Sequence, residues 1–89
     1  MALLIDPPVW PWHGRKWSHL VSDVAYEELH AFVEQQLGIP RRAFQGDHYD
    51  VPDELHDVAV AAGALPVSCR ELLSRLQAAG LRRPHRHGP

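Results

Sequence analysis

The chain has 89 residues, with nine lysines and arginines, eleven aspartates and glutamates and seven histidines, which gives a net charge of −2 when the histidines are neutral. This length allows one domain with a small hydrophobic core, because compact domains range from about 50 to 250 residues. The small negative charge argues against electrostatically driven binding of nucleic acid. There is no apolar run of the roughly 20 residues that cross a bilayer, and no signal-peptide pattern. The single cysteine, Cys69, cannot form an internal disulfide, so we expect a cytoplasmic domain that does not bind membranes.

The charges are distributed unevenly along the chain. Residues 23–57 contain nine acidic residues and two arginines, a net charge of −7, whereas residues 70–89 contain five arginines and one glutamate, a net charge of +4. The end of the chain, residues 81–89, is polar and has no apolar periodicity. We therefore expect residues 1–80 to form the domain and residues 81–89 to form a disordered basic tail that contains histidines.

The first quarter of the chain predicts two strands. Ala2–Ile5 is an apolar run that stops at an Asp-Pro-Pro sequence, as a short buried strand does. The following segment, Trp10–Lys16, predicts a loop because a proline and a glycine interrupt it. Trp17–Ser22 alternates, which predicts a strand with Trp17, His19 and Val21 on one face.

The rest of the chain predicts three helices and a further strand. Apolar residues spaced three and four apart predict a helix from Ala25 to Leu37, which is ended by a Gly-Ile-Pro sequence. A second helix fits Pro52–Ala62, with apolar side chains at 55, 58, 59 and 62 facing inward. Ala64–Val67 is a strand candidate, and Ser68–Glu71 has the spacing of a capping box that begins a helix ending at Ala79.

This order of elements predicts a small layered α/β domain, with a three- or four-stranded, at least partly parallel sheet and about three helices. In such sheets ligands gather beyond the carboxyl ends of the strands. Those ends carry Asp6, Ser22–Asp23 and Ser68–Arg70, so a site is expected there.

The segment Asp47–Asp50 is the densest group of polar residues inside the expected domain. If the segment is extended, His48 and Asp50 point to the same side, because residues two apart share a face. They then form either a base with its orienting acid or two metal ligands. A divalent metal would need further ligands from His19, His13 or Asp6, and the sequence predicts no particular cofactor. The alternative is that Asp50 caps the next helix and His48 is a surface residue.

Two other polar positions have both a functional and a structural interpretation. His19 is either a residue that binds or protonates a ligand or a core histidine that bonds to a backbone carbonyl. Arg70, next to Ser68 at the start of the last helix, is either the clamp for an anion or the partner of a nearby carboxylate such as Asp6 or Asp50.

The segment Trp10–Trp17 contains three tryptophans together with Arg15 and Lys16. Aromatic rings beside cations are typical of base stacking, of cation–π recognition and of protein-docking surfaces, but two basic residues are too few to indicate DNA binding. The alternative is that the tryptophans cover one face of the sheet.

Taken together and in order, several short strings resemble a bacterial and phage family known only as domain of unknown function 4031. They are Trp17-Ser-His-Leu20, Glu28-Leu-His-Ala-Phe32, Leu37-Gly38, Phe44-Gln45, His48-Tyr-Asp-Val51, Gly63-Ala64 and the segment from Pro66 to Leu72, and the resemblance covers about residues 3–75. It implies no established activity. It does imply that Asp6, Trp17, His19, His48, Tyr49, Asp50 and Arg70 belong to the family pattern.

The chain departs from this pattern at two places. Relatives tend to have Thr-Asp and basic residues where this chain has Pro52–Asp57, so a basic patch on that helix is absent here. Cys69 stands where relatives often have tryptophan, which argues against a catalytic thiol.

The sequence therefore predicts a polar cleft that binds a small anionic or phosphate-bearing ligand, with hydrolytic or transfer chemistry as a possible consequence. The expected catalytic residues are His48, Asp50 and His19, and the expected ligand-binding residues are Asp6, Arg70, Tyr49, Trp17, Arg15 and Ser68. The competing hypothesis is a protein-interaction module that docks on an unidentified protein through Trp10–Trp17, with the polar residues only stabilising the fold.

Overall fold

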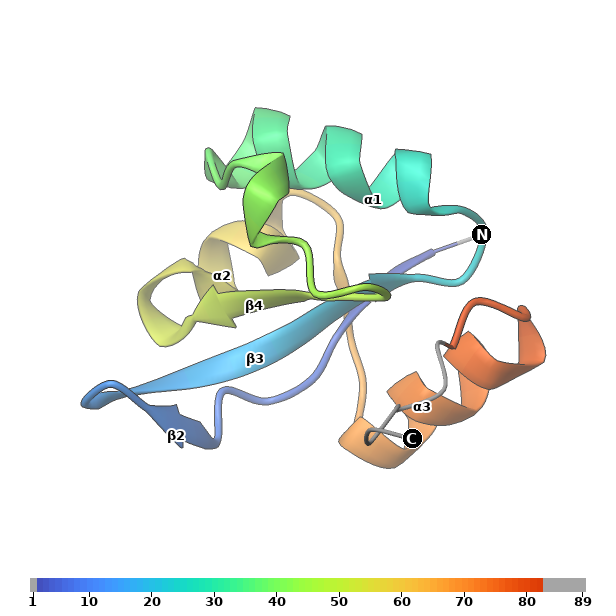
Figure 1. Ribbon diagram of the computed structural model, residues 1–89. Helices are drawn as coiled ribbons and strands as arrows, with labels where there is room; N and C mark the ends of the chain where they lie inside the picture. Colours follow the sequence, from blue (N-terminus) through green and yellow to red (C-terminus); the bar gives the residue numbers. More distant parts are fainter. Residues whose placement is uncertain (1, 83–89) are drawn as a thin grey trace, which may run out of the picture.

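The computed structural model describes residues 2–82, which form a five-stranded mixed sheet with helices on both faces (Figure 1). The elements are β1 (Leu3–Ile5), β2 (Trp10–Trp12), β3 (Arg15–Ser22), α1 (Tyr26–Phe32), β4 (Tyr49–Pro52), α2 (Asp53–Ala61), β5 (Leu65–Pro66) and α3 (Cys69–Ala78). The predicted α/β class, the helices and the partly parallel sheet are confirmed, with one strand more than expected. Most of the predicted tail, residues 83–89, lies outside the described residues, whereas Leu81 and Arg82 contact the domain.

Strand β3 is the centre of the sheet. Leu20 pairs with Ile5 of β1 on one edge and with Tyr49 of β4 on the other, and both pairings are antiparallel. Closer to the start of β3, Trp17 pairs in the same way with β2 and β4. Strand β5 adds to the free edge of β1 in parallel. The end of β1 therefore lies directly beside the middle of β3, where the site begins.

The expected loop at Trp10–Lys16 is wrong, because these residues form a β-hairpin between β2 and β3. The two-residue turn consists of His13 and Gly14, with φ angles of 51° and 73°. Two consecutive positive φ angles are what a type I′ hairpin turn requires. Pro11 is tolerated because β2 pairs with β3 alone and is an edge strand.

Helices α1 and α2 cover one face of the sheet (Figure 1). Leu20, Leu29 and Ala59 are fully buried in the core that they form. Helix α1 continues as a wider π-helical turn over Val33–Leu37 and ends at Gly38, as predicted. In α2, Val58 is exposed rather than inward, because the buried face of the helix is centred toward Ala59.

Helix α3 covers the opposite face of the sheet, where Leu72 and Leu76 pack against Leu4 of β1 and Val21 of β3. The Ser68 hydroxyl accepts a hydrogen bond from the Glu71 backbone N–H at 3.0 Å, which confirms the predicted cap.

Asp23 attaches the end of β3 to the rest of the domain. Its carboxylate accepts a hydrogen bond from the Ala2 N–H at 2.8 Å and pairs with Arg75 of α3 at 2.8 Å. Helix α3 is thus held by an ion pair as well as by its leucines.

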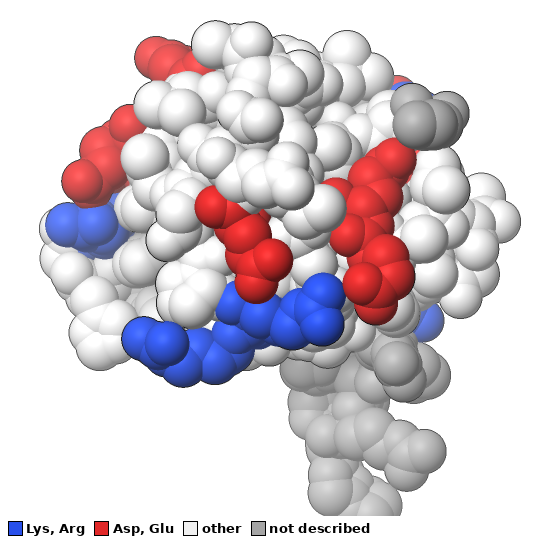
Figure 2. Space-filling model, turned by 90° about the horizontal axis from the view of Figure 1, so that it is seen from above, with Lys and Arg blue, Asp and Glu red and all other residues white. Residues whose placement is uncertain are grey.

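On the face seen from the side of α1, acidic and basic side chains lie near one another rather than in one broad patch of either sign (Figure 2). One such pair joins Arg41 to Glu27 at 3.3 Å. Among the described residues, no helix has the length and apolar character to span a bilayer.

Candidate functional site

A pocket of about 200 Å³ lies between the sheet and α3. Its apolar wall consists of Val21 of β3 and three leucines of α3, with the ring of Trp10 beside it. Its polar wall consists of His19, Asp47, His48, Cys69 and Arg82. Since pockets for drug-sized ligands have about 300–1,000 Å³, this one fits a small molecule or one group of a larger ligand.

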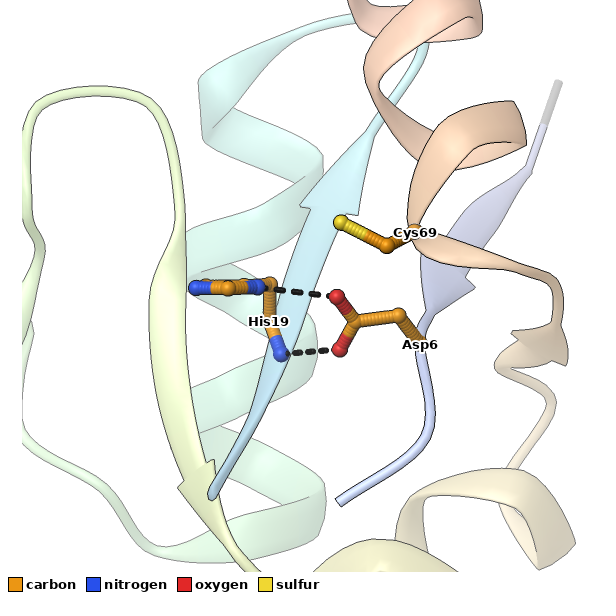
Figure 3. Close-up of side chains that lie close together, drawn as sticks. All are labelled: Asp6, His19 and Cys69. Atoms are coloured by element: carbon orange, nitrogen blue, oxygen red, sulfur yellow. Dashed lines mark hydrogen bonds and ion pairs between the residues drawn. The ribbon is translucent and has the colours of Figure 1, made fainter. Parts of the chain in front are cut away.

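The first polar pair of the pocket joins Asp6 to His19 (Figure 3). Asp6 follows β1 and has no exposed surface. One of its carboxylate oxygens accepts a hydrogen bond from the His19 backbone N–H at 2.6 Å, and the other lies 2.8 Å from Nδ1 of the same residue. A buried carboxylate only accepts, so it holds His19 with the proton on Nδ1. Within residues 2–82, no hydrogen bond engages Nε2 of His19, which is left available for a ligand.

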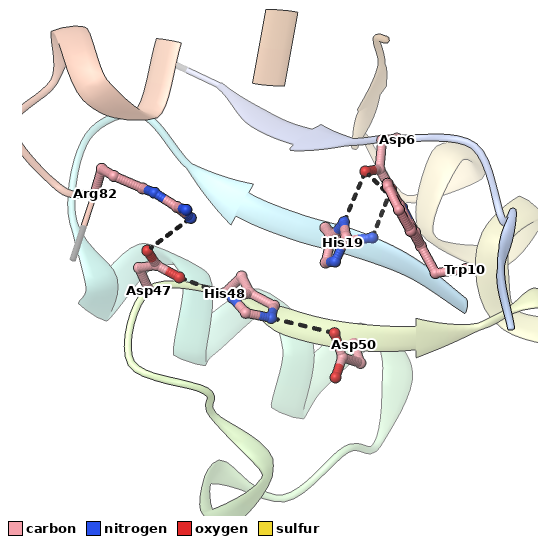
Figure 4. Close-up of polar contacts among 7 residues, drawn as sticks. All are labelled: Asp6, Trp10, His19, Asp47, His48, Asp50 and Arg82. Carbon is pink, nitrogen blue, oxygen red and sulfur yellow. Dashed lines mark hydrogen bonds and ion pairs between the residues drawn. The ribbon is translucent and has the colours of Figure 1, made fainter. Parts of the chain in front are cut away.

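The second group of the site is centred on His48, which lies between two carboxylates (Figure 4). Its Nδ1 is 2.8 Å from Asp47, and its Nε2 is 3.2 Å from Asp50. The spacing of two residues on an extended segment places His48 and Asp50 together, as the sequence predicts. Asp50 does not cap the following helix, whose N-cap residue is Pro52.

The two carboxylates stabilise the protonated form of His48. Burial by itself lowers the pKa of His48, but the hydrogen bonds to Asp50 and Asp47 outweigh it and the pKa is raised. In turn, the hydrogen bond from His48 lowers the pKa of Asp50. Of the histidine and carboxylate side chains of the site, His48 is therefore the one best suited to carry a positive charge.

The two groups meet inside the molecule. The ring centroids of His19 and His48 are 5.1 Å apart, and the rings meet edge to face. One potential ligand atom from each of His19, His48 and Asp50 lies within 4.8 Å of the other two. The same holds for Asp6, His19 and Cys69. Four of the predicted site residues, Asp6, His19, His48 and Asp50, are thus brought together.

Cys69 is the first residue of α3 and points toward Asp6 (Figure 3). Burial raises the pKa of the Cys69 thiol, and the neighbouring Asp6 carboxylate raises it further. The thiol is therefore not activated as a nucleophile, in line with the sequence-based argument against that role.

Of the nine predicted site residues, His19 and His48 line the pocket, and Asp6 and Asp50 lie behind them, each paired with one of the two rings. Three of the remaining five lie elsewhere on the domain. The side chain of Tyr49 is fully buried on the opposite face of the sheet, where its hydroxyl lies 2.7 Å from Nδ1 of His30. Arg70 is exposed and forms no ion pair with any described residue. It is rotated about 100° around α3 from Cys69, which lines the pocket. Ser68 is exposed, and its hydroxyl caps α3.

The other two, Arg15 and Trp17, lie on the β2–β3 hairpin. Arg15 pairs with Glu54 at 2.8 Å, and its guanidinium lies 5.9 Å from the centre of the Trp17 ring. The Trp17 indole N–H donates to the Trp12 carbonyl at 2.9 Å. Both side chains therefore stabilise the hairpin instead of lining the pocket.

The structure adds three residues that the sequence did not assign to the site. Trp10 donates its indole N–H to Asp6 at 3.3 Å, and its ring lies 5.1 Å from that of His19. Asp47 is buried and pairs with both His48 and Arg82, the latter at 3.4 Å. Arg82 falls in the expected tail, and it is the cation at the pocket in place of Arg70.

The fold and this pocket define a small mixed α/β domain with a histidine–carboxylate site. The family described as "Protein of unknown function (DUF4031)" matches residues 3–79, so the chain belongs to that family. The match confirms the resemblance found in the sequence. No curated protein and no solved structure matches the chain.

Proposed function

We propose that the pocket is the active site of a hydrolase or transferase that acts on a small anionic molecule, such as a phosphate ester. The observation that carries this proposal is the pair of histidines, 5.1 Å apart, each bonded through Nδ1 to a carboxylate. Histidines oriented in this way are the usual general acids and bases of enzymes. The volume of about 200 Å³ suits a phosphate-sized group.

In the observed arrangement the two histidines have different roles. His19, with its proton held on Nδ1 by Asp6, offers the lone pair of Nε2 as a base. His48, whose protonated form is stabilised by Asp47 and Asp50, is the acid. Arg82, on the same wall of the pocket, faces the negative charge of the substrate.

For hydrolysis of a phosphate ester, water gives one proton to Nε2 of His19 while its oxygen bonds to phosphorus. The bond from phosphorus to the alcohol oxygen breaks, and that oxygen takes the proton from Nε2 of His48. The products are inorganic phosphate and the alcohol, and both histidines then exchange protons with solvent. If an acceptor hydroxyl replaces water, the same steps give transfer.

The proposal is tested by thermal shift against inorganic phosphate, nucleotides and carboxylates, together with release of p-nitrophenol from p-nitrophenyl phosphate. A ligand at about 100 times its dissociation constant adds about 2.7 kcal/mol of stability, which raises Tm by about 10–20 °C in a domain of this size. The shift and the turnover are expected to disappear in His19→Ala and His48→Ala.

The matched control is His56→Ala, since His56 lies on α2, pairs with Asp57 and does not line this pocket. This variant should keep the shift and the turnover. If the native protein shows neither with any of these compounds, or if His48→Ala keeps both, the proposal is wrong.

A second candidate function, docking on a protein partner, is favoured by the exposure of the hairpin tryptophans. Trp10 and Trp12 are 41% and 58% exposed, so both can contact a partner. Docking would be excluded if both were fully buried. Under this alternative, Trp12→Ser abolishes capture of a partner and leaves ligand shifts unchanged. Loss of the phosphate shift in Trp12→Ser, with no partner captured by the native protein, would argue against it.

A further inference from the structure

We propose that His19, His48 and Asp50 form a binding site for one divalent metal ion of the zinc class. This inference rests on the proposed function and amends it, because an ion held by the Nε2 atoms of both histidines would take over from them the activation of water at the same pocket. The three residues come from the middle of β3, from the position before β4 and from β4 itself. Two imidazoles and one carboxylate are a common ligand set for zinc and for non-haem iron.

The orientation of both rings supports this assignment. The Nδ1 atoms of His19 and His48 are each bonded to a carboxylate, Asp6 and Asp47, at 2.8 Å. Histidines that bind metals through Nε2 almost always donate their other N–H to a carboxylate, a carbonyl or water. Here both outer partners are already in place, and both are buried.

The distances between the potential ligand atoms fit one ion. Zinc binds nitrogen and carboxylate oxygen at about 2.0–2.2 Å, so two ligands in a tetrahedral site are about 3.3 Å apart. Nε2 of His48 and the carboxylate of Asp50 are 3.2 Å apart. The potential ligand atom of His19 lies within 4.8 Å of both, so it must move closer to them to complete the set. In binding, the metal replaces the Nε2 proton that His48 shares with Asp50.

The charges around the pocket also favour a cation. Asp6, Asp47 and Asp50 supply three carboxylates, against the guanidinium of Arg82 and the imidazolium of His48. A small anionic substrate would enter a site in which negative groups outnumber positive ones. A divalent ion reverses this balance, and three protein ligands leave a coordination position open for water or a substrate oxygen.

The second group of potential ligands, Asp6, His19 and Cys69, is less suitable. Both carboxylate oxygens of Asp6 already accept hydrogen bonds from His19, and a metal there would have to break them. The Cys69 side chain would also have to lose its proton next to that carboxylate. The two sites share His19, so they are separated by substitutions at residues that belong to one set alone, such as Asp50 and Cys69.

The test is calorimetric titration of the untagged protein with zinc chloride, in a His85→Ala/His87→Ala background that removes the histidines near the end of the chain. The expected result is one ion per chain. Loss of a residue that only hydrogen-bonds a metal ligand, such as Asp6 or Asp47, lowers metal affinity by roughly 10–100-fold. His48→Ala and Asp50→Asn, which remove ligands themselves, should lower the zinc affinity by more than that. The matched controls, His56→Ala and Cys69→Ser, should bind zinc like the parent protein.

Titration with cobalt gives a second readout that does not depend on stability. Tetrahedral cobalt bound by nitrogen and oxygen absorbs in the visible range, and a thiolate ligand adds a charge-transfer band in the near ultraviolet. We expect the visible bands without the thiolate band. Asp50→Asn should lose them while the circular dichroism spectrum stays native, and Asp50→His, which keeps a metal-binding side chain, should restore them in part.

The assignment is overturned if zinc does not bind, or if binding survives Asp50→Asn and disappears in Cys69→Ser. Binding is measured without substrate, so a failure to hydrolyse any test ester bears on the proposed function alone. Conversely, turnover that persists after complete chelation refutes a role of the metal in turnover and leaves the acid–base function standing.

Discussion

The contact between Asp6 and His19 allows a prediction about proton position as well as stability. In Asp6→Asn, the amide must be oriented with its oxygen toward the His19 backbone N–H, which donates a hydrogen bond to Asp6 at 2.6 Å in the native protein. The amide nitrogen then takes the position that faces Nδ1 of His19 and the indole of Trp10. Since that nitrogen only donates, Nδ1 must become the acceptor and the His19 proton must move to Nε2.

The expected cost follows from the same three contacts. Hydrogen bonds to charged groups contribute about 1.5–3 kcal/mol each and neutral ones about 0.5–1.5, so the free energy of unfolding should fall by about 2 kcal/mol. In a domain of this size Tm falls by about 8–16 °C. Asp57→Asn is the control, because the Asp57 side chain is fully exposed.

Nitrogen chemical shifts of the imidazoles in alkaline buffer report directly which ring nitrogen carries the proton. The native protein should show a protonated Nδ1 in His19, and Asp6→Asn should show a protonated Nε2 and a zinc affinity lowered by about 10–100-fold. If the proton stays on Nδ1 in Asp6→Asn, the account of how Asp6 orients His19 is wrong.

Three further predictions concern other parts of the molecule. Burial by itself raises the pKa of Asp23, but its bonds to the Ala2 N–H and to Arg75 lower it below the ordinary 3.8. The ionised carboxylate therefore stabilises the fold above that pH, and this stabilisation is lost as the pH falls through the pKa of the folded state. Urea unfolding should show Asp23→Asn about 1–2 kcal/mol less stable than the native protein at pH 7, and equal losses at pH 7 and pH 2 would contradict the linkage. His13 has a φ of 51°, and His13→Asn gives the turn the Asn-Gly sequence that such angles favour. The free energy of unfolding should rise by about 0.5 kcal/mol, and a decrease would refute the turn assignment. Since burial and Asp6 raise the pKa of Cys69, iodoacetamide should alkylate it at pH 7 more slowly in the folded than in the urea-unfolded chain, and equal rates would argue against that environment.

The elements with local end signals could be predicted from the sequence. The capping box at Ser68 and the proline at 52 mark the starts of α3 and α2 to within one residue. The β2–β3 hairpin is not predicted, because Pro11 and Gly14 are read in sequence as interruptions of a strand. They are an edge-strand residue and half of a two-residue turn, a pattern that the alternating residues on either side would have revealed.

The site could be predicted only as far as its residues are close in sequence. His48 and Asp50 are two residues apart on one strand, so their pairing follows from strand geometry. The pairing of Asp6 with His19 depends on the register between β1 and β3, which the sequence does not fix. Nothing local to Arg82 shows that it folds back to Asp47, so the sequence places it in the tail. Arg70 stands at a helix start, which predicts an anion site, but the rotation of α3 turns it outward.

The parallel pairing of β1 with β5 has a consequence for the order of folding. Leu4 pairs with Leu65, so roughly 60 residues must be arranged before this contact forms, whereas β2 and β3 meet across two residues. Helix α3 follows β5 directly and provides one wall of the pocket. We therefore expect the hairpin, with His19 on β3, to belong to an early folding unit and the pocket to close late. In hydrogen exchange the amides of α3 should open at lower free energy than those of β3, so that the wall of the pocket opens while the histidine pair stays in place.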